Sequence, residues 1–279
     1  MSNHTLEPTA PAAPHAACAT CPVQAHARLR KLGVDVSGWD YTVALAGNPN
    51  TGKSTIFNAL TGLRQHTGNW PGKTVTRAEG GFVYQNKRYK LIDLPGTYSL
   101  LSTSTDEEVA RDFILFGCPN VTIVVADATR LERNLNLVLQ ILAITDRVVV
   151  AVNLIDEARR HGITVDTRGL TRDLGVPVVP MVARRGEGLP ELLGFIAEVA
   201  SGAYQTRPRH LALRNPNLER ALDQLIPQVT AAFPGLPNAR WVALRLLDGD
   251  PSITQAVRDG TLGDLSRGLA PAPIALEVV

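Results

Sequence analysis

The apolar residues of the chain form short continuous runs separated by stretches in which they recur at helical spacing. Four of the runs are apolar on both faces, as buried parallel strands are, and they span 41–46, 121–126, 148–152 and 176–181. The stretches between them predict amphipathic helices. Strands that alternate with helices predict an α/β fold with a mostly parallel sheet and helices on both faces. We expect its ligand outside the carboxyl ends of the strands.

Two shorter runs, 81–84 and 89–92, lie on either side of Asn86 and predict a hairpin. With them, the expected sheet has six strands. The segment 63–76 contains two glycines, a proline and an asparagine, which favour a loop.

The two ends of the chain differ from this central pattern. Residues 1–40 predict an N-terminal extension that is rich in Ala and Pro and disordered, with a short helix over 25–32. Residues 203–279 predict a small all-α regulatory domain whose first helix begins at Asn215-Pro216. The central domain is therefore expected to span 41–202.

Composition narrows the class of protein. The chain has 279 residues, of which 44% are hydrophobic, and a net charge of +2, which argues against a nucleic-acid partner. It contains no run near the roughly 20 apolar residues of a membrane span, and its start does not have the features of a secretory signal. Three cysteines cannot form a disulfide framework, so we expect a cytoplasmic location.

The strongest motif follows the first apolar run. Residues 47–54 read Gly-Asn-Pro-Asn-Thr-Gly-Lys-Ser and match the phosphate loop G-x-x-x-x-G-K-[ST], between a predicted strand and a predicted helix. Backbone N–H groups of such a loop bind phosphate oxygens. Lys53 is expected to contact the β- and γ-phosphates, and the Ser54 hydroxyl is expected to bind Mg²⁺.

Two further segments have the positions expected of nucleotide switches. A threonine in the loop 63–76 is expected to close over Mg²⁺, and we favour Thr74 with Thr76 as the alternative. Asp93 and Gly96 form a D-x-x-G motif at the end of a buried strand, where the aspartate is expected to hold Mg²⁺ and the glycine N–H to contact the γ-phosphate.

A third motif predicts the base. Asn153 and Asp156 form N-x-x-D at the end of another strand, and a carboxylate there can accept hydrogen bonds from N1–H and the exocyclic amine of guanine. Adenine lacks these donors, so the buried carboxylate would stay unpaired. The loop at Val182, Ala183 and Arg184 is expected to cover the base with its backbone N–H groups. The predicted nucleotide-binding set is therefore Gly47, Asn48, Pro49, Asn50, Thr51, Gly52, Lys53, Ser54, Thr55, Asn153, Asp156, Val182, Ala183 and Arg184.

The N-terminal extension contains a cluster of soft ligands: His15, Cys18, Cys21 and His26. A C-x-x-C pair is half of many zinc and iron sites. A solvated tail without metal is the alternative, because a full site usually takes its second pair from a distant segment.

The phosphate loop, the segment Gly68-Asn69-Trp70-Pro71-Gly72 and the segment 93–100, Asp-Leu-Pro-Gly-Thr-Tyr-Ser-Leu, together resemble the FeoB family of bacterial ferrous-iron transporters. Residues 241–250 also resemble the helical domain of that family. The resemblance implies a Ras-like P-loop GTPase with a mostly parallel six-stranded sheet, followed by an all-α domain. It also implies a location at the cytoplasmic face of the bacterial inner membrane, where the chain would be fused to a membrane-embedded iron-permeation domain.

By the same resemblance, Asn50 and backbone carbonyls near Gly68 and Trp70 would bind K⁺ beside the phosphates. The cation would do the work of an arginine finger, since Thr97 stands where other GTPases have a catalytic glutamine. The implied catalytic set is Asn50, Lys53, Thr74 and Gly96, with GTP or GDP, Mg²⁺ and K⁺ as ligands. The metal-binding set is Ser54, Thr74, Asp93, Asn50, Gly68 and Trp70.

Ala183 stands where the family usually has Ser, which is expected to weaken the hold on guanine and speed exchange. Small accessory proteins of iron uptake and an oligomer are further expected partners. Two alternatives are a soluble ribosome- or tRNA-associated GTPase that lacks the glutamine, and a binding module with negligible turnover. Membrane-spanning segments beyond Val279 would favour transport.

Overall fold

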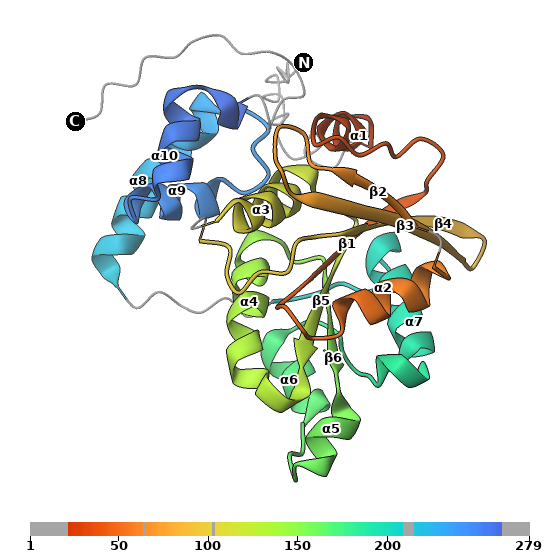
Figure 1. Ribbon diagram of the computed structural model, residues 1–279. Helices are drawn as coiled ribbons and strands as arrows, with labels where there is room; N and C mark the ends of the chain where they lie inside the picture. The colour runs from red at the N-terminus through yellow and green to blue at the C-terminus, as the bar shows by residue number, and fades with distance from the viewer. Residues whose placement is uncertain (1–21, 64, 102–103, 209–214, 264–279) are drawn as a thin grey trace, which may run out of the picture.

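The computed structural model describes residues 22–63, 65–101, 104–208 and 215–263. Its centre is one seven-stranded sheet in the order β2-β3-β4-β1-β5-β6-β7 (Figure 1). The strands are β1 (Tyr41–Gly47), β2 (Gln65–Asn69), β3 (Thr76–Tyr84), β4 (Lys87–Asp93), β5 (Val121–Asp127), β6 (Val148–Asn153) and β7 (Val178–Pro180). All pairings are parallel except those of β3, which is antiparallel to both β2 and β4. The predicted α/β class, a mostly parallel Ras-like sheet with a helical domain, is confirmed.

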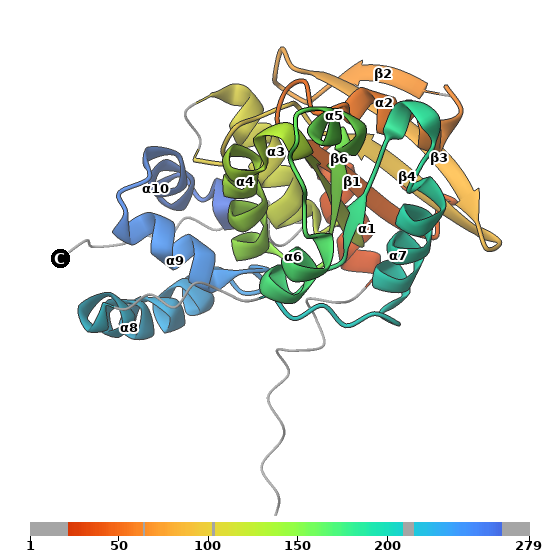
Figure 2. The same cartoon turned by 90° about the horizontal axis from the view of Figure 1, so that it is seen from below.

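Helices cover both faces of the sheet (Figure 2). They are α1 (Pro22–Lys31), α2 (Lys53–Thr61), α3 (Thr105–Gly117), α4 (Leu131–Ile144), α5 (Ile155–Arg160), α6 (Thr167–Leu174) and α7 (Leu189–Ser201). Because side chains alternate along a strand, Leu45 of β1 packs with α2 and α7, whereas Ala44 packs with α3 and α4. The sheet thus has a core on each side, and the loops after β1, β4 and β6 meet at one edge.

The sheet has one strand more than the six predicted. The additional strand is β2, in the segment expected to be a loop, and it pairs with β3 from Gln65 opposite Gly80 to Asn69 opposite Thr76. Its residues Gln, His, Thr, Gly and Asn contain no apolar alternation. An edge strand held by backbone hydrogen bonds needs no such pattern.

The short helix expected over 25–32 is present as α1, but the segment that follows it, up to residue 40, differs from the predicted disordered extension. The side chains of Leu29 in α1, and of Val34 and Val36 after it, are buried in the core shared with α3. Arg77 of β3 donates a hydrogen bond to the carbonyl of Leu32 at 3.2 Å. Residues 27–40 therefore pack on the central domain instead of forming a disordered tail.

The C-terminal helices are α8 (Pro216–Ala232), α9 (Ala239–Leu247) and α10 (Pro251–Arg258). Asn215 caps α8 as its sequence predicts, through its side chain and the N–H of Asn217 at 3.0 Å. The domain contacts α4 through Asn238, which donates to the carbonyl of Ile144 at 2.9 Å, and α3 through Arg111 and Ser252 at 2.6 Å. Within the described ranges, none of the helices combines the length and the apolar character needed to cross a bilayer.

Candidate nucleotide-binding site

The phosphate loop joins β1 to α2. Gly47 is the last residue of β1, and Lys53 is the first residue of α2. Between them, Asn50 and Gly52 have left-handed backbone, with φ of 66° and 83°. This curled path turns the chain from the strand into the helix, and it points the N-terminus of α2 toward the edge where the other motifs end.

Asn153 links the phosphate loop to the base motif. Its buried side chain donates to the carbonyl of Thr51 at 2.9 Å and accepts from the N–H of Ala183 at 2.9 Å. One amide therefore holds three predicted segments together: the phosphate loop, the end of β6 and the loop at 182–184. Asn153 uses both the NH₂ group and the carbonyl oxygen of its side-chain amide, so no other residue type of this size could make both hydrogen bonds.

The close approach of Asn153 explains the second glycine of the phosphate loop. A Cβ on Gly52 would lie 2.3 Å from Asn153 Nδ2, in a backbone conformation that already disfavours side chains. We expect Gly52→Ala to destabilise the fold by about 2–4 kcal/mol, because it combines left-handed strain with loss of the Asn153 bridge. Thermal unfolding of the purified protein measures the effect.

Gly62, which follows α2, provides the matched control. It has φ of 61°, and a Cβ there would meet nothing within 4 Å. Gly62→Ala should therefore cost only the backbone strain, about 1 kcal/mol. Equal losses in the two variants would contradict the argument from Asn153.

Lys53 and Asp93 come together from α2 and β4. Lys53 Nζ donates to the Asp93 carboxylate and to the carbonyl of Leu94, the latter at 2.7 Å. Both side chains are largely buried, and desolvation raises the pKa of Asp93 while Lys53 opposes the shift. The predicted phosphate-binding lysine and the predicted Mg²⁺-binding aspartate thus share one site.

The D-x-x-G segment runs along the phosphate loop. The N–H of Leu94 donates to Leu45 at 2.9 Å, and the N–H of Thr97 donates to Gly47 at 3.3 Å. The Cα of Gly96 faces Pro49, which a Cβ on this glycine would meet at 3.5 Å. The structure therefore places Gly96 against the phosphate loop.

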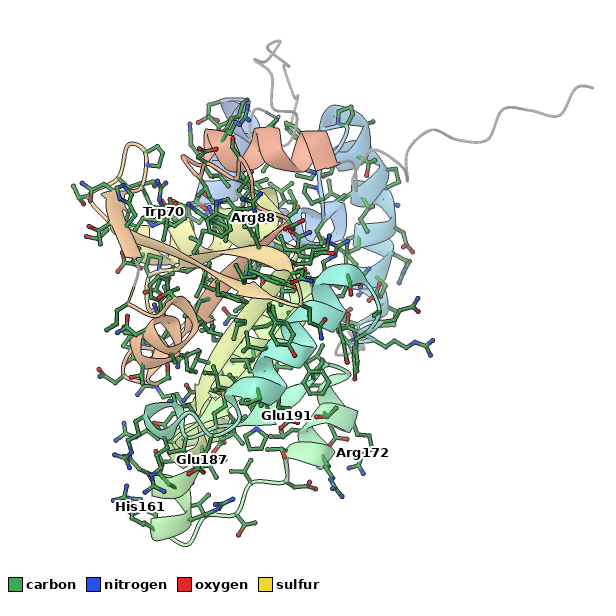
Figure 3. The ribbon with its side chains drawn as sticks, turned by 90° about the vertical axis from the view of Figure 1, so that its right-hand side faces the viewer. Trp70, Arg88, His161, Arg172, Glu187 and Glu191 are labelled. Carbon is green, nitrogen blue, oxygen red and sulfur yellow. The ribbon has the colours of Figure 1, made fainter. Side chains whose placement is uncertain are left out.

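The loop that carries Trp70 and Thr74 has a different position. Trp70 is buried against Phe113 of α3, with a centroid separation of 5.5 Å, and its carbonyl accepts from the N–H of Lys73 at 3.0 Å. Lys73 also pairs with Glu108 of α3 at 2.7 Å, and Thr74 is exposed. Trp70 lies at the end of the molecule near α1, away from Glu187 and His161 at the opposite end (Figure 3). The structure does not bring this loop onto the phosphate loop.

The surroundings of Asp156 contain a group that the sequence did not single out. Arg184 was expected to contribute its backbone, but its guanidinium pairs with Asp156 Oδ2. Asp156 Oδ1 is buried without a hydrogen-bond partner among the described residues. The hydrogen bond from Arg184 is the main reason that the pKa of Asp156 is below its ordinary value. No sequence signal predicts this side-chain contact.

The predicted Cys/His cluster lies outside the residues that the structure describes. His15, Cys18 and Cys21 are not among the described residues, and neither is the side chain of His26. Across the ranges that are described, no three His, Cys, Asp or Glu side chains are grouped as metal ligands.

Comparisons with known proteins match both domains. The sequence model of the ferrous iron transport protein B family matches residues 41–196, and that of the FeoB cytosolic helical domain matches residues 215–269. The chain is 42% identical over 213 residues to the Fe(2+) transporter FeoB of Salmonella typhimurium, covering 75% of this chain and 27% of that protein. It is 42% identical over 217 residues to the FeoB of Escherichia coli K12, with the same coverage. The chain thus spans about a quarter of the length of these relatives.

Solved structures agree with this match. The cytosolic domain of T. maritima FeoB in its apo form has a TM-score of 0.71 and 40% identity, covering 80% of this chain and 86% of that one. The same protein in its GMPPNP form has a TM-score of 0.69 and 41% identity, with the same coverage. The cytosolic domain of L. pneumophila FeoB has a TM-score of 0.71 and 34% identity, covering 80% and 88%. On this evidence the chain belongs to the FeoB family and corresponds to its cytosolic part.

Proposed function

We propose that this chain binds and hydrolyses GTP, and that it regulates or drives ferrous-iron uptake by a membrane domain of the same polypeptide. The bridge of Asn153 between the phosphate loop and the base-covering loop is the observation that carries the nucleotide assignment. Oδ1 of Asp156 is buried and has no hydrogen-bond partner among the residues that the structure describes, which supports guanine as the base because a buried carboxylate oxygen needs a donor. The GDP and GMPPNP forms of T. maritima FeoB support the same ligand class.

The roles of the residues follow from their positions. The ammonium of Lys53 neutralises the β- and γ-phosphates, and the N–H groups from Asn48 to Ser54 bind their oxygens. The N–H of Gly96, which lies beside Pro49, would contact the γ-phosphate. Thr97 follows it in place of a glutamine, so the attacking water is positioned by backbone groups.

The donor set fits Mg²⁺, which prefers hard oxygen ligands. The Ser54 hydroxyl and the Asp93 carboxylate would hold the ion, with Thr74 joining when its loop closes. When bound, Mg²⁺ neutralises charge on the β- and γ-phosphate oxygens. Closure requires this loop to leave α3, which means breaking the Lys73–Glu108 pair.

Potassium would require the same rearrangement. Asn50 lies on the phosphate loop, but Gly68 is paired with Arg77 in the sheet and the Trp70 carbonyl is bonded to Lys73. In this conformation, the Trp70 carbonyl therefore already accepts a hydrogen bond. We propose that the shell forms when the loop of Trp70 moves toward the phosphates.

The test is phosphate release from GTP at saturating Mg²⁺, with KCl or NaCl at equal ionic strength. We expect K⁺ to accelerate turnover about tenfold or more over Na⁺, because a fixed cation stabilises charge that develops on the β–γ bridge. Asn50→Ala should remove the difference between the salts. ATP at the same concentration should give little turnover.

N-methylglucamine chloride provides the baseline rate without either cation. Equal rates in K⁺ and Na⁺ would contradict the potassium site while leaving GTP hydrolysis intact. Absence of GTP turnover in both salts would contradict the proposed enzyme and favour a binding module. The match of residues 215–269 to a FeoB-specific helical domain favours transport over a ribosome- or tRNA-associated GTPase. Accessory proteins and an oligomer remain proposals.

A further inference from the structure

Arg184 connects the base-covering loop to the carboxylate that reads the base. It lies in the short 3₁₀ helix η2 (Ala183–Arg185), and its guanidinium contacts Oδ2 of Asp156 at the start of α5. Its Nη2 is also 3.7 Å from Glu157. Figure 3 shows the two elements at the same end of the molecule, where Glu187 follows η2 and His161 follows α5.

The two oxygens of Asp156 have different surroundings. Oδ1 is buried and has no hydrogen-bond partner in the described part of the chain, whereas Oδ2 accepts a hydrogen bond from Arg184 and lies 3.9 Å from both Arg160 and Arg185. Guanine presents two donors, N1–H and the 2-amino group, and so needs both oxygens of one carboxylate. Hypoxanthine lacks the 2-amino group and needs only one.

We propose that Arg184 is a specificity-determining residue that competes with the guanine 2-amino group for Oδ2 of Asp156. The proposal rests on the proposed function, since it assumes that Asp156 reads the base. Arg184 speeds release of guanine nucleotides by offering the carboxylate another partner. It also lowers the preference for guanine over hypoxanthine.

The difference in exposure between Asp156 and Arg184 suits an ion pair that a ligand can displace. The Asp156 side chain is 13% exposed, but that of Arg184 is 53% exposed. An arginine that reaches a carboxylate from solvent can swing back into water at little cost. The same contact holds the pKa of Asp156 below its ordinary value.

Arg185 provides a matched control because it belongs to the same loop and carries the same charge. Its Nη2 is 3.9 Å from Asp156 Oδ2, beyond hydrogen-bond distance, and its Nη1 forms an ion pair with Glu187 at 3.6 Å. Substituting it changes the net charge of the site without freeing Oδ2.

The experiment measures the release of fluorescently labelled GDP and IDP by stopped flow from wild type, Arg184→Met, Arg184→Lys and Arg185→Met. Arg184→Met should slow GDP release about three- to fivefold and change IDP release less than about twofold, because exposed ion pairs contribute up to about 1 kcal/mol. Arg184→Lys keeps the charge but not the planar guanidinium, so its rate of GDP release should lie between those of the wild type and Arg184→Met. Arg185→Met should match wild type within about twofold.

If Arg184→Met slowed the release of GDP and IDP equally, the effect would arise from the loop that contains Arg184 and not from the Asp156 carboxylate. This result would overturn the proposal. Unchanged or faster GDP release in Arg184→Met would also overturn it, while leaving the guanine site intact. Failure of the wild type to bind either nucleotide, with Mg²⁺ present, would overturn the proposed function together with this inference.

Discussion

Replacing Lys53 with alanine is expected to weaken GDP and GTP binding by about 10²- to 10³-fold, since charge-assisted hydrogen bonds to phosphate are lost from a largely buried site. Lys53 Nζ lies beside Asp93 and the Leu94 carbonyl, with its side chain 12% exposed. Its removal leaves the Asp93 carboxylate without its cation, so burial acts on the pKa of Asp93 unopposed. Isothermal titration calorimetry with GDP and with a non-hydrolysable GTP analogue measures the effect.

Lys90→Ala is the control for this variant. Lys90 is 14% exposed and pairs with Glu79, so the variant removes a lysine of similar burial and the same charge from strand β4. It should leave the GDP dissociation constant within about twofold, because its contacts are with Glu79 and the Trp39 ring. If Lys53→Ala bound GDP as tightly as Lys90→Ala does, the phosphate assignment would be wrong.

The sequence predicts best those strands that are buried on both faces of the sheet. β1, β5 and β6 are continuous apolar runs because each strand contacts helices on both faces, and their ends therefore mark where the motifs converge. The phosphate loop and Asn153 could be found because their roles depend on backbone turns and on one amide at a strand end. Local chemistry is enough to identify such residues.

The burial of residues 27–40 and the strand at 65–69 could not be predicted in this way, although the sequence does predict a short helix over 25–32. α1 reads Pro-Val-Gln-Ala-His-Ala-Arg-Leu-Arg-Lys, in which few apolar residues signal a buried face. Leu29 is buried only because α3 provides a partner that is distant in sequence. β2 is polar, and its pairing depends on the exposed edge of β3. In both cases the deciding contact is with another element.

The same limit applied to the site. The sequence identified Asp156, but the contact of Arg184 depends on how η2 turns over α5, which no local pattern records. Trp70 is a similar case: its motif predicted a switch loop, while its burial against Phe113 follows from the packing of α3. Side-chain partners across loops therefore need the structure, even where the motif itself is plain.

Asp156→Asn is expected to lower GTP affinity by about 10²-fold and to raise the affinity for XTP, because the carboxylate is exchanged for one acceptor and one donor. Guanine then offers its 2-amino group to an amide N–H₂, and two donors face each other. Xanthine has a carbonyl at that position and accepts from the asparagine. Arg184, released from its ion pair, is a second donor near the same carbonyl. Competition of GTP and XTP against a fluorescent nucleotide measures the change.

Glu157→Gln separates a change of base reading from a change of charge. Glu157 follows Asp156 on α5, is half-buried, and lies near Arg160 and Arg184 at 3.5 and 3.7 Å. The variant removes the same negative charge one residue further along, where it does not face the base-reading position. Its preference for GTP over XTP should equal that of the wild type. A shift toward XTP in both variants would assign specificity to the net charge around α5, and no shift in Asp156→Asn would remove Asp156 from base recognition altogether.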